Sequence, residues 1–188
     1  GFTIRGFDIG IVNYSAHPTL IEKNTLENNS WGNYVHSPNQ ALSHNIIVEN
    51  ILGGLYSGST SYDDVFVGNT FRDNGTRQHE SSYGDFAGDC VNNSLIESNI
   101  FLPSQADRDY IIRGINLYRN SGERNRIRTE LPHNDIIRNN SFDGYTIAIQ
   151  IGARMGRKVH YDLSGEDRDY AFYNTVEHNL IKNTEVGI

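Results

Sequence analysis

Short apolar runs and polar, turn-forming residues alternate along the chain in a frame that recurs. In the clearest copy, a polar residue at Asp135 is followed by Ile137, then by Asn140, then by Phe142. The same order of polar, apolar, asparagine and large apolar residue is found six times, with the asparagines at Asn24, Asn50, Asn69, Asn99, Asn140 and Asn179. Recurrence in a fixed frame indicates a repeat architecture.

The spacing of these asparagines favours stacked β-strands over helical repeats. Successive asparagines are separated by 26, 19, 30, 41 and 39 residues. A helical solenoid would keep a steadier period and show 3.6-residue periodicity. The apolar residues alternate in short runs instead, as half-buried strands require. An asparagine amide at each turn can bond the backbone and its copy in the next turn, so we expect a stacked ladder beside an apolar column.

Two further strands are expected between the copies, at residues 111–118 and 145–151. Alternate isoleucines of the second strand should point inward, and the residues between them outward. These isoleucines are Ile147, Ile149 and Ile151.

Six segments follow the frame, with Phe7 in the place of the asparagine in the first of them: GFTIRGF, IEKNTLENNS, FVGNTFRDNG, IESNIF, IIRNNSFDG and VEHNLIKNTEVGI. Through them the chain resembles the pectin-lyase-like superfamily. The resemblance implies an all-β fold, a right-handed parallel β-helix of about seven coils with long inserted loops. That superfamily contains lyases, hydrolases, epimerases and non-catalytic surface proteins, so the fold alone does not give the function.

Length and composition favour one β-helix domain over residues 1–188. Neither end shows the polar cap that terminal repeats normally carry, so we expect an excerpt of a longer solenoid. One cysteine excludes an internal disulfide, and no run of about 20 apolar residues predicts a membrane-spanning helix. The resemblance implies a secreted, periplasmic or cell-surface protein.

The charge distribution argues against a nucleic-acid partner. The net charge is −7, whereas nucleic-acid-binding domains are basic with a clustered stripe. Residues 1–100 contain 4 Lys or Arg and 11 Asp or Glu, and residues 101–188 contain 12 of each group. A polysaccharide or oligosaccharide, including an anionic one facing the arginine-rich half, is the expected partner.

Long loops on consecutive coils predict a groove. The longest insertions are 72–89, 103–133 and 152–172. Consecutive coils stack about 4.8 Å apart, so these loops would stand side by side. Long loops are usually functional or disordered, and insertions in repeat proteins often gather on the binding face. Trp31 belongs to a shorter excursion, 31–39, whose aromatic residues suit sugar stacking or packing back on the coil.

Carboxylates of the first long loop are candidates for glycoside hydrolysis. A pair of carboxyl groups can act as acid and base, or as acid and nucleophile. Glu80, Asp85 and Asp89 offer such a pair. The alternative is a solvated acidic loop, since carboxylates mostly lie exposed.

Basic residues of the later loops are candidates for β-elimination. A uronate lyase must neutralise the sugar carboxylate before a base removes the neighbouring proton, and arginine binds carboxylates in a bidentate manner. We assign catalysis to Arg113, Arg154 and His160. Neighbouring residues are assigned to substrate binding: Arg108, Tyr110, Lys158 and Tyr161. Ion pairing with nearby acidic residues is the structural alternative.

No metal-ligand spacing is present, because the seven histidines are dispersed. No cofactor is expected, although calcium bound by scattered loop carboxylates is compatible with the sequence. The leading hypothesis is a carbohydrate-active enzyme, a lyase or a glycoside hydrolase, that cleaves or modifies a polysaccharide in a groove on the β-helix. The alternative is a non-catalytic β-helix surface, adhesion or phage-fibre module.

Overall fold

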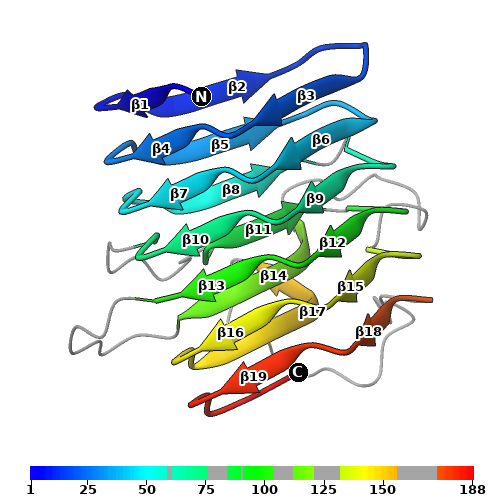
Figure 1. Ribbon diagram of the computed structural model, residues 1–188. Helices are drawn as coiled ribbons and strands as arrows, with labels where there is room; N and C mark the ends of the chain where they lie inside the picture. Colours follow the sequence, from blue (N-terminus) through cyan, green and yellow to red (C-terminus); the bar gives the residue numbers. More distant parts are fainter. Residues whose placement is uncertain (59–60, 76–83, 90, 104–111, 121–131, 156–172) are drawn as a thin grey trace.

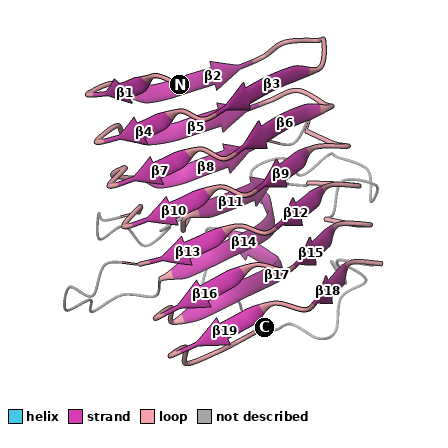
Figure 2. Ribbon diagram, viewed as in Figure 1, coloured by secondary structure: helices cyan, strands magenta, loops and turns pink. Residues whose placement is uncertain are grey.

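The chain winds into stacked levels of β-structure. The computed structural model describes residues 1–188 except 59–60, 76–83, 90, 104–111, 121–131 and 156–172. Within the described residues every regular element is a strand, and Figure 2 shows no helix.

The strands form three parallel sheets, which we call A, B and C. Sheet A contains β1 (Thr3–Arg5), β4 (Thr25–Glu27), β7 (Ile46–Val48), β10 (Thr70–Arg72), β13 (Ile100–Leu102), β16 (Ser141–Asp143) and β19 (Leu180–Lys182). Sheet B contains β2 (Ile9–Asn13), β5 (Trp31–Val35), β8 (Gly53–Ser57), β11 (Phe86–Asp89), β14 (Arg113–Asn120) and β17 (Ile147–Met155). Sheet C contains β3 (Thr19–Glu22), β6 (Gln40–Ser43), β9 (Val65–Val67), β12 (Leu95–Glu97), β15 (Ile136–Arg138) and β18 (Thr175–Glu177).

Each coil contributes one strand to sheet A, then one to sheet B, then one to sheet C. Each strand pairs in parallel with its equivalents in the coils above and below, so no sheet contains sequential strands as neighbours. Figure 1 shows the coils stacked from the N-terminal end to the C-terminal end, with sheets A and C in front and sheet B behind. The predicted parallel β-helix is therefore confirmed.

The asparagine ladder is present, with one change of membership. Each backbone N–H of this first polar column donates to the side-chain oxygen of the next member at 2.9–3.0 Å. Its members are Asn24, Asn45, Asn69, Asn99, Asn140 and Asn179. The side-chain amides also donate to backbone carbonyls, as Asn69 does to Leu42 at 2.9 Å. The column lies at the corner between sheets C and A.

Asn50 belongs to a second polar column, so its predicted place in the first one is wrong. This column lies between sheets A and B and contains Asn29, Asn50, Asn74 and Asp85. A third polar column opens the strands of sheet C and contains Gln40, Asp64, Ser94, Asp135 and Asn174. The first and second columns lie five residues apart in the sequence, so the repeat frame also fits when it is moved by five residues. The predicted copy at Asn45–Leu52 is displaced by such a shift towards the C-terminus.

An apolar centre runs between the columns. The residues two after the first five asparagines of this column are buried in a single row: Leu26, Ile47, Phe71, Phe101 and Phe142. Ile181, two after Asn179, is partly buried. The rings of Phe71 and Phe101 stack at 4.8 Å, and those of Phe101 and Phe142 at 4.6 Å. The predicted apolar column inside the coil is therefore present.

Sheet B departs most from the sequence prediction. Residues 31–35 and 86–89 form β5 and β11, although both were assigned to loops. The two strands expected near 111–118 and 145–151 are present as β14 and β17. Ile149 is buried and Ile151 packs against the core as expected, but Ile147 is not part of the core and Ala148, expected to point outward, is buried. The position before Ile149 therefore faces the core. The equivalent position in the neighbouring strand, Gly114, faces it too, since a side chain there would meet Phe142.

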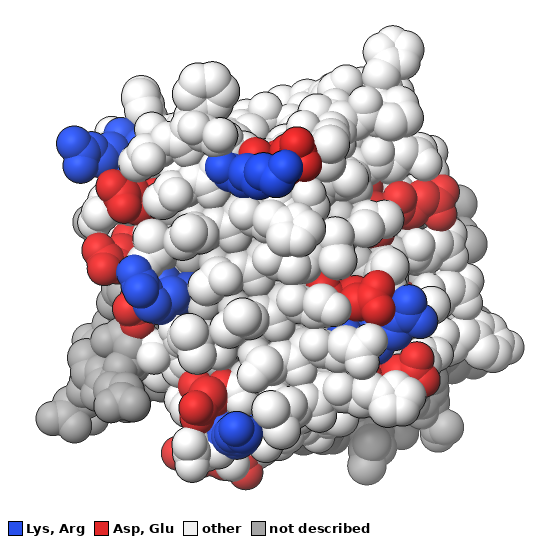
Figure 3. Space-filling view, in the orientation of Figure 1, with Lys and Arg blue, Asp and Glu red and all other residues white. Residues whose placement is uncertain are grey.

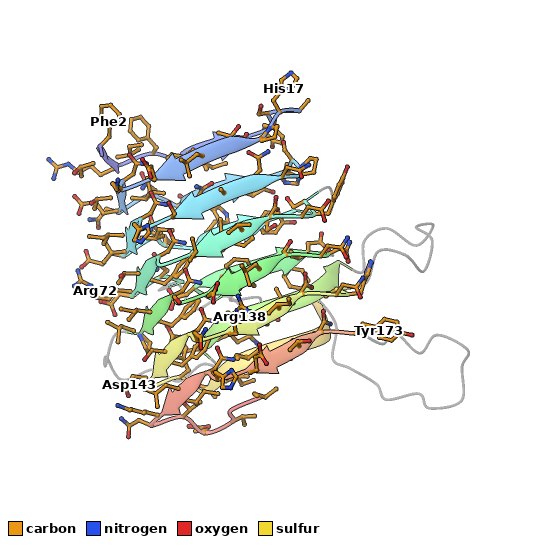
Figure 4. The ribbon with its side chains drawn as sticks, turned by 45° about the vertical axis from the view of Figure 1, so that its right-hand side comes forward. Phe2, His17, Arg72, Arg138, Asp143 and Tyr173 are labelled. Atoms are coloured by element: carbon orange, nitrogen blue, oxygen red, sulfur yellow. The ribbon has the colours of Figure 1, made fainter. Side chains whose placement is uncertain are left out.

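The outer faces of sheets A and C carry few charges. Figure 3 shows scattered acidic and basic side chains around a largely uncharged surface. Arg138, labelled in Figure 4, pairs with Glu97 of the neighbouring strand at 2.8 Å. Tyr173 projects away from the coils in the same view. Exposed ion pairs of this kind contribute little stability, so the core and the polar columns carry the fold.

Candidate functional site

The outer face of sheet B carries a group of aromatic residues that is separate from the main core. Leu55, Phe86 and Ile115 align on three adjacent strands and point into the core. The next residue of each strand points the other way, because side chains alternate along a strand. That outward row contains Val12, Tyr34, Tyr56, Ala87, Asn116 and Gln150.

Aromatic rings from β5 and β8 pack together on this face. The rings of Tyr34 and Tyr56 stack at 4.5 Å, and His36 lies 4.6 Å from Tyr34. Trp31 meets Tyr56 edge to face at 5.6 Å. A side chain at Gly53 would come within 2.5 Å of the Trp31 ring, so glycine there makes room for the indole. We call Trp31, Tyr34, His36 and Tyr56 the aromatic cluster.

A carboxylate adjoins the aromatic cluster. The hydroxyl of Tyr56 donates to Asp89 Oδ2 at 3.3 Å, and Asp89 is 5% exposed. Burial lowers the pKa of His36, and the negative charge of Asp89 partly opposes this. The imidazole is therefore neutral at pH 7 and can accept a proton. A carboxylate, a phenol and a neutral imidazole are all groups that act in general acid–base catalysis.

Arg113 lies on the same face at its other end. Its Nε donates to Gln150 Oε1 at 2.5 Å, and burial lowers the pKa of its guanidinium. The register that pairs Phe86 with Ile115 places Arg113 five residues back from the level of Asp89. Five residues of strand span about 16 Å, so the backbones of Arg113 and Asp89 are well separated along the strand direction.

Asp85 lies in the interior instead of on the outer face. Its Oδ1 accepts from Asn74 Nδ2 at 2.7 Å, which makes it the last member of the second polar column. The hydroxyl of Tyr145 donates to its other oxygen, and the residue is 1% exposed. Asp85 therefore points into the corner before β11, whereas Asp89 points outward from the end of that strand.

Most of the remaining predicted site residues lie outside the described part of the chain. Arg154 is in β17, where its backbone aligns with Arg119. The others fall in the ranges not described: Glu80, Arg108, Tyr110, Lys158, His160 and Tyr161. The predicted groove walls at 72–89, 103–133 and 152–172 fall largely in these ranges too. These assignments stay predictions.

The structure adds Tyr56, which the sequence analysis does not assign to a site, to Tyr34 and His36 of the excursion 31–39, whose aromatic residues are expected to stack on a sugar or to pack back on the coil. A signal for them exists, because WGNYVHS at 31–37 aligns with GGLYSGS at 53–59. In both segments glycine precedes tyrosine by two residues. Extending the repeat frame past its asparagines would have placed the two tyrosines side by side.

Neither a metal centre nor a membrane span is found where the structure is described. Across those residues no three His, Cys, Asp or Glu side chains are grouped to hold an ion. The described segments also contain no helix of the length and hydropathy that crossing a membrane requires. Calcium binding by the remaining loops stays a prediction.

Comparison with protein-family models and with curated proteins finds no match to this chain.

Proposed function

We propose that the protein is a carbohydrate-active enzyme that binds a polysaccharide over the outer face of sheet B and cleaves or modifies it there. The contact between the aromatic cluster and Asp89 is the observation that supports this most. Aromatic rings present apolar area with polar edges, which suits a sugar ring, and Asp89 supplies an acid–base group beside them.

In this proposal Tyr34 and Trp31 bind the sugar, and Asp89 and Tyr56 transfer protons. The neutral imidazole of His36 serves as the base or orients it. Arg113 binds a carboxylate or hydroxyl of a sugar unit several residues along the strand direction. Asp89 is the one carboxylate in the strands of sheet B. Hydrolysis uses two carboxyl groups about 5–10 Å apart, and β-elimination uses a base beside a neutralised sugar carboxylate. Both reactions remain part of the proposal, and Tyr56 or His36 would be the base in β-elimination.

A product assay tests the proposal. Purified protein is incubated with alginate, pectate, glycosaminoglycans and neutral glycans. Absorbance of an unsaturated uronate would indicate elimination, and new reducing ends without it would indicate hydrolysis. We expect Asp89→Asn and Tyr56→Phe to lower kcat by about 100-fold or more on the active substrate. Glu22→Gln, on the outer face of sheet C, is the matched control and should keep full activity. Full activity in both site variants would overturn the residue roles.

A non-catalytic glycan-binding module is the second candidate. The separation of Arg113 from Asp89 favours it, because these two predicted catalytic residues lie at opposite ends of the face. The same panel separates the two functions. Saturable binding without any product supports the module, and product formation excludes it.

A further inference from the structure

The third polar column contains two buried aspartates. Backbone N–H groups of Gln40 and Ser94 donate to Oδ1 of Asp64 and Asp135 at 2.8 and 3.0 Å. Asp64 is 1% exposed and Asp135 is fully buried. Ser94 lies between them in the column and accepts from the N–H of Asp64.

The second oxygen of each carboxyl group lacks a donor. Asp64 Oδ2 and Asp135 Oδ2 are buried and have no hydrogen-bond partner among the described residues. At the same position of the last column member, Asn174 Nδ2 donates to the backbone carbonyl of Pro132 at 3.0 Å. An amide satisfies this position because it donates a proton. A carboxylate cannot, but a protonated carboxyl group can.

The carbonyls available to such a proton follow from the repeat. Pro132 lies three residues before Asp135, and amides of the other columns bond the equivalent carbonyl of the coil before, as Asn69 bonds Leu42. For Asp64 and Asp135 the equivalent carbonyls are those of Ser37 and Val91.

Burial and the charges around the two aspartates also favour their protonated forms. Burial raises the pKa of Asp64 to about 7 and that of Asp135 to about 8, against the opposing effect of the backbone N–H bonds. Asp63 adds negative charge beside Asp64, and Asp64 adds it near Asp135. The other column members, Gln40, Ser94 and Asn174, are uncharged. His133, two residues before Asp135, forms an isolated β-bridge through its backbone with Asn92 of the coil before.

We propose that Asp64 and Asp135 form a pH-sensitive element inside the β-helix. As carboxylic acids they complete the third polar column, and as carboxylates they loosen the corner at which sheet B passes into sheet C. Asp89 lies five residues before Ser94, so this corner adjoins the candidate site. The effect on stability stands alone, whereas an effect on activity rests on the proposed function.

The sign of the effect follows from proton binding. In the unfolded chain an aspartate has a pKa of about 3.9. The folded protein therefore holds two protons that the unfolded chain releases above about pH 4. Their contribution to stability is complete below about pH 4 and is lost as the pH rises through 7 and 8.

Denaturant unfolding between pH 5 and pH 9 tests the proposal. We expect the wild-type protein to lose stability as the pH rises, with a slope that corresponds to up to two protons released on unfolding. Asp64→Asn and Asp135→Asn should each reduce that number by one, because asparagine keeps the acceptor and adds a permanent donor. The control Asp143→Asn lies on the outer face of sheet A and should leave the slope unchanged. An unchanged slope in both interior variants would overturn the proposal.

A titration of the wild-type protein tests the same point without any variant. The carboxyl carbons of isotope-labelled aspartates are followed by NMR. Two resonances should titrate near neutral or alkaline pH, and titration of every aspartate in the acidic range would contradict the proposal. If the two resonances behave as expected and no glycan is bound or cleaved, the proposed function fails while the pH-sensitive element stands.

Discussion

At the scale of single residues, buried asparagines differ in what their amides contact. Asn99 donates to Phe66 and to Asn140, and it accepts from the backbone and side chain of Asn69. We expect Asn99→Ala to destabilise the protein by about 2–4 kcal/mol, because several buried groups lose their partner. Asn24 is partly exposed in the first coil, so Asn24→Ala should cost clearly less. Equal losses in denaturant unfolding would contradict a role for the ladder.

Replacement of Asn33 is expected to stabilise the protein, in contrast to replacement of Asn99. Its side chain is fully buried, and neither polar atom has a partner among the described residues. It aligns with Ile11 and Leu55 in an otherwise apolar row. We expect Asn33→Leu to stabilise the protein by about 1–2 kcal/mol, since a buried unpaired amide is replaced by packing. A loss of stability would show that the amide is satisfied in solution.

The polar columns differ in how well their members could be predicted from the sequence. Five of the six predicted ladder asparagines occupy the first column, because that column contains asparagine in every coil from Asn24 to Asn179. The third column corresponds to the polar residue that opens each predicted copy, as at Asp135, and only Gln40 is missing from that prediction. It is filled in turn by Gln40, Asp64 and Ser94, which share only an acceptor atom. The repeat conserves hydrogen-bonding capacity there, and the residue type varies.

At the scale of elements, the stacked phenylalanines of sheet A hold neighbouring coils together. Phe101 is fully buried and lies between Phe71 and Phe142 with nearly parallel rings. We expect Phe101→Ala to cost about 3–5 kcal/mol, through lost burial and the cavity it leaves. The exposed Leu20, on the outer face of sheet C, is the control, and Leu20→Ala should change stability by less than about 0.5 kcal/mol. A similar loss in both variants would contradict the packing described.

The strands of sheet B explain why the candidate site was only partly predictable. In β5 a polar residue, Asn33, points inward while aromatic residues point outward, so the usual alternation of apolar and polar residues is reversed. In β11 Ala87 and Gly88 leave no apolar pattern to recognise. Trp31 and Asp89 were nevertheless selected by residue type. Asp85 was selected for the same reason, and only the fold shows that it points inward.

At the scale of the whole molecule, the three faces differ in what they offer a ligand. Sheets A and C present short strands with small and β-branched residues outward. Charged residues are scattered over this surface, as Figure 3 shows. Sheet B presents the aromatic cluster, Asp89 and Arg113 on adjacent coils. Because adjacent coils are held by parallel strand pairing, the relative positions of these residues are fixed by the stack. Sheet B is therefore the face on which we place the proposed glycan site.

The fluorescence of Trp31 tests this assignment most directly, because it is the single tryptophan of the chain and lies in the aromatic cluster. Emission is recorded while the protein is titrated with the polysaccharides of the product assay. We expect a saturable change with at least one of them, and at least tenfold weaker binding in Tyr34→Ala, whereas Glu22→Gln should bind as the wild type does. A polysaccharide that binds by an independent method but leaves Trp31 emission unchanged would contradict the assignment of the site to the outer face of sheet B.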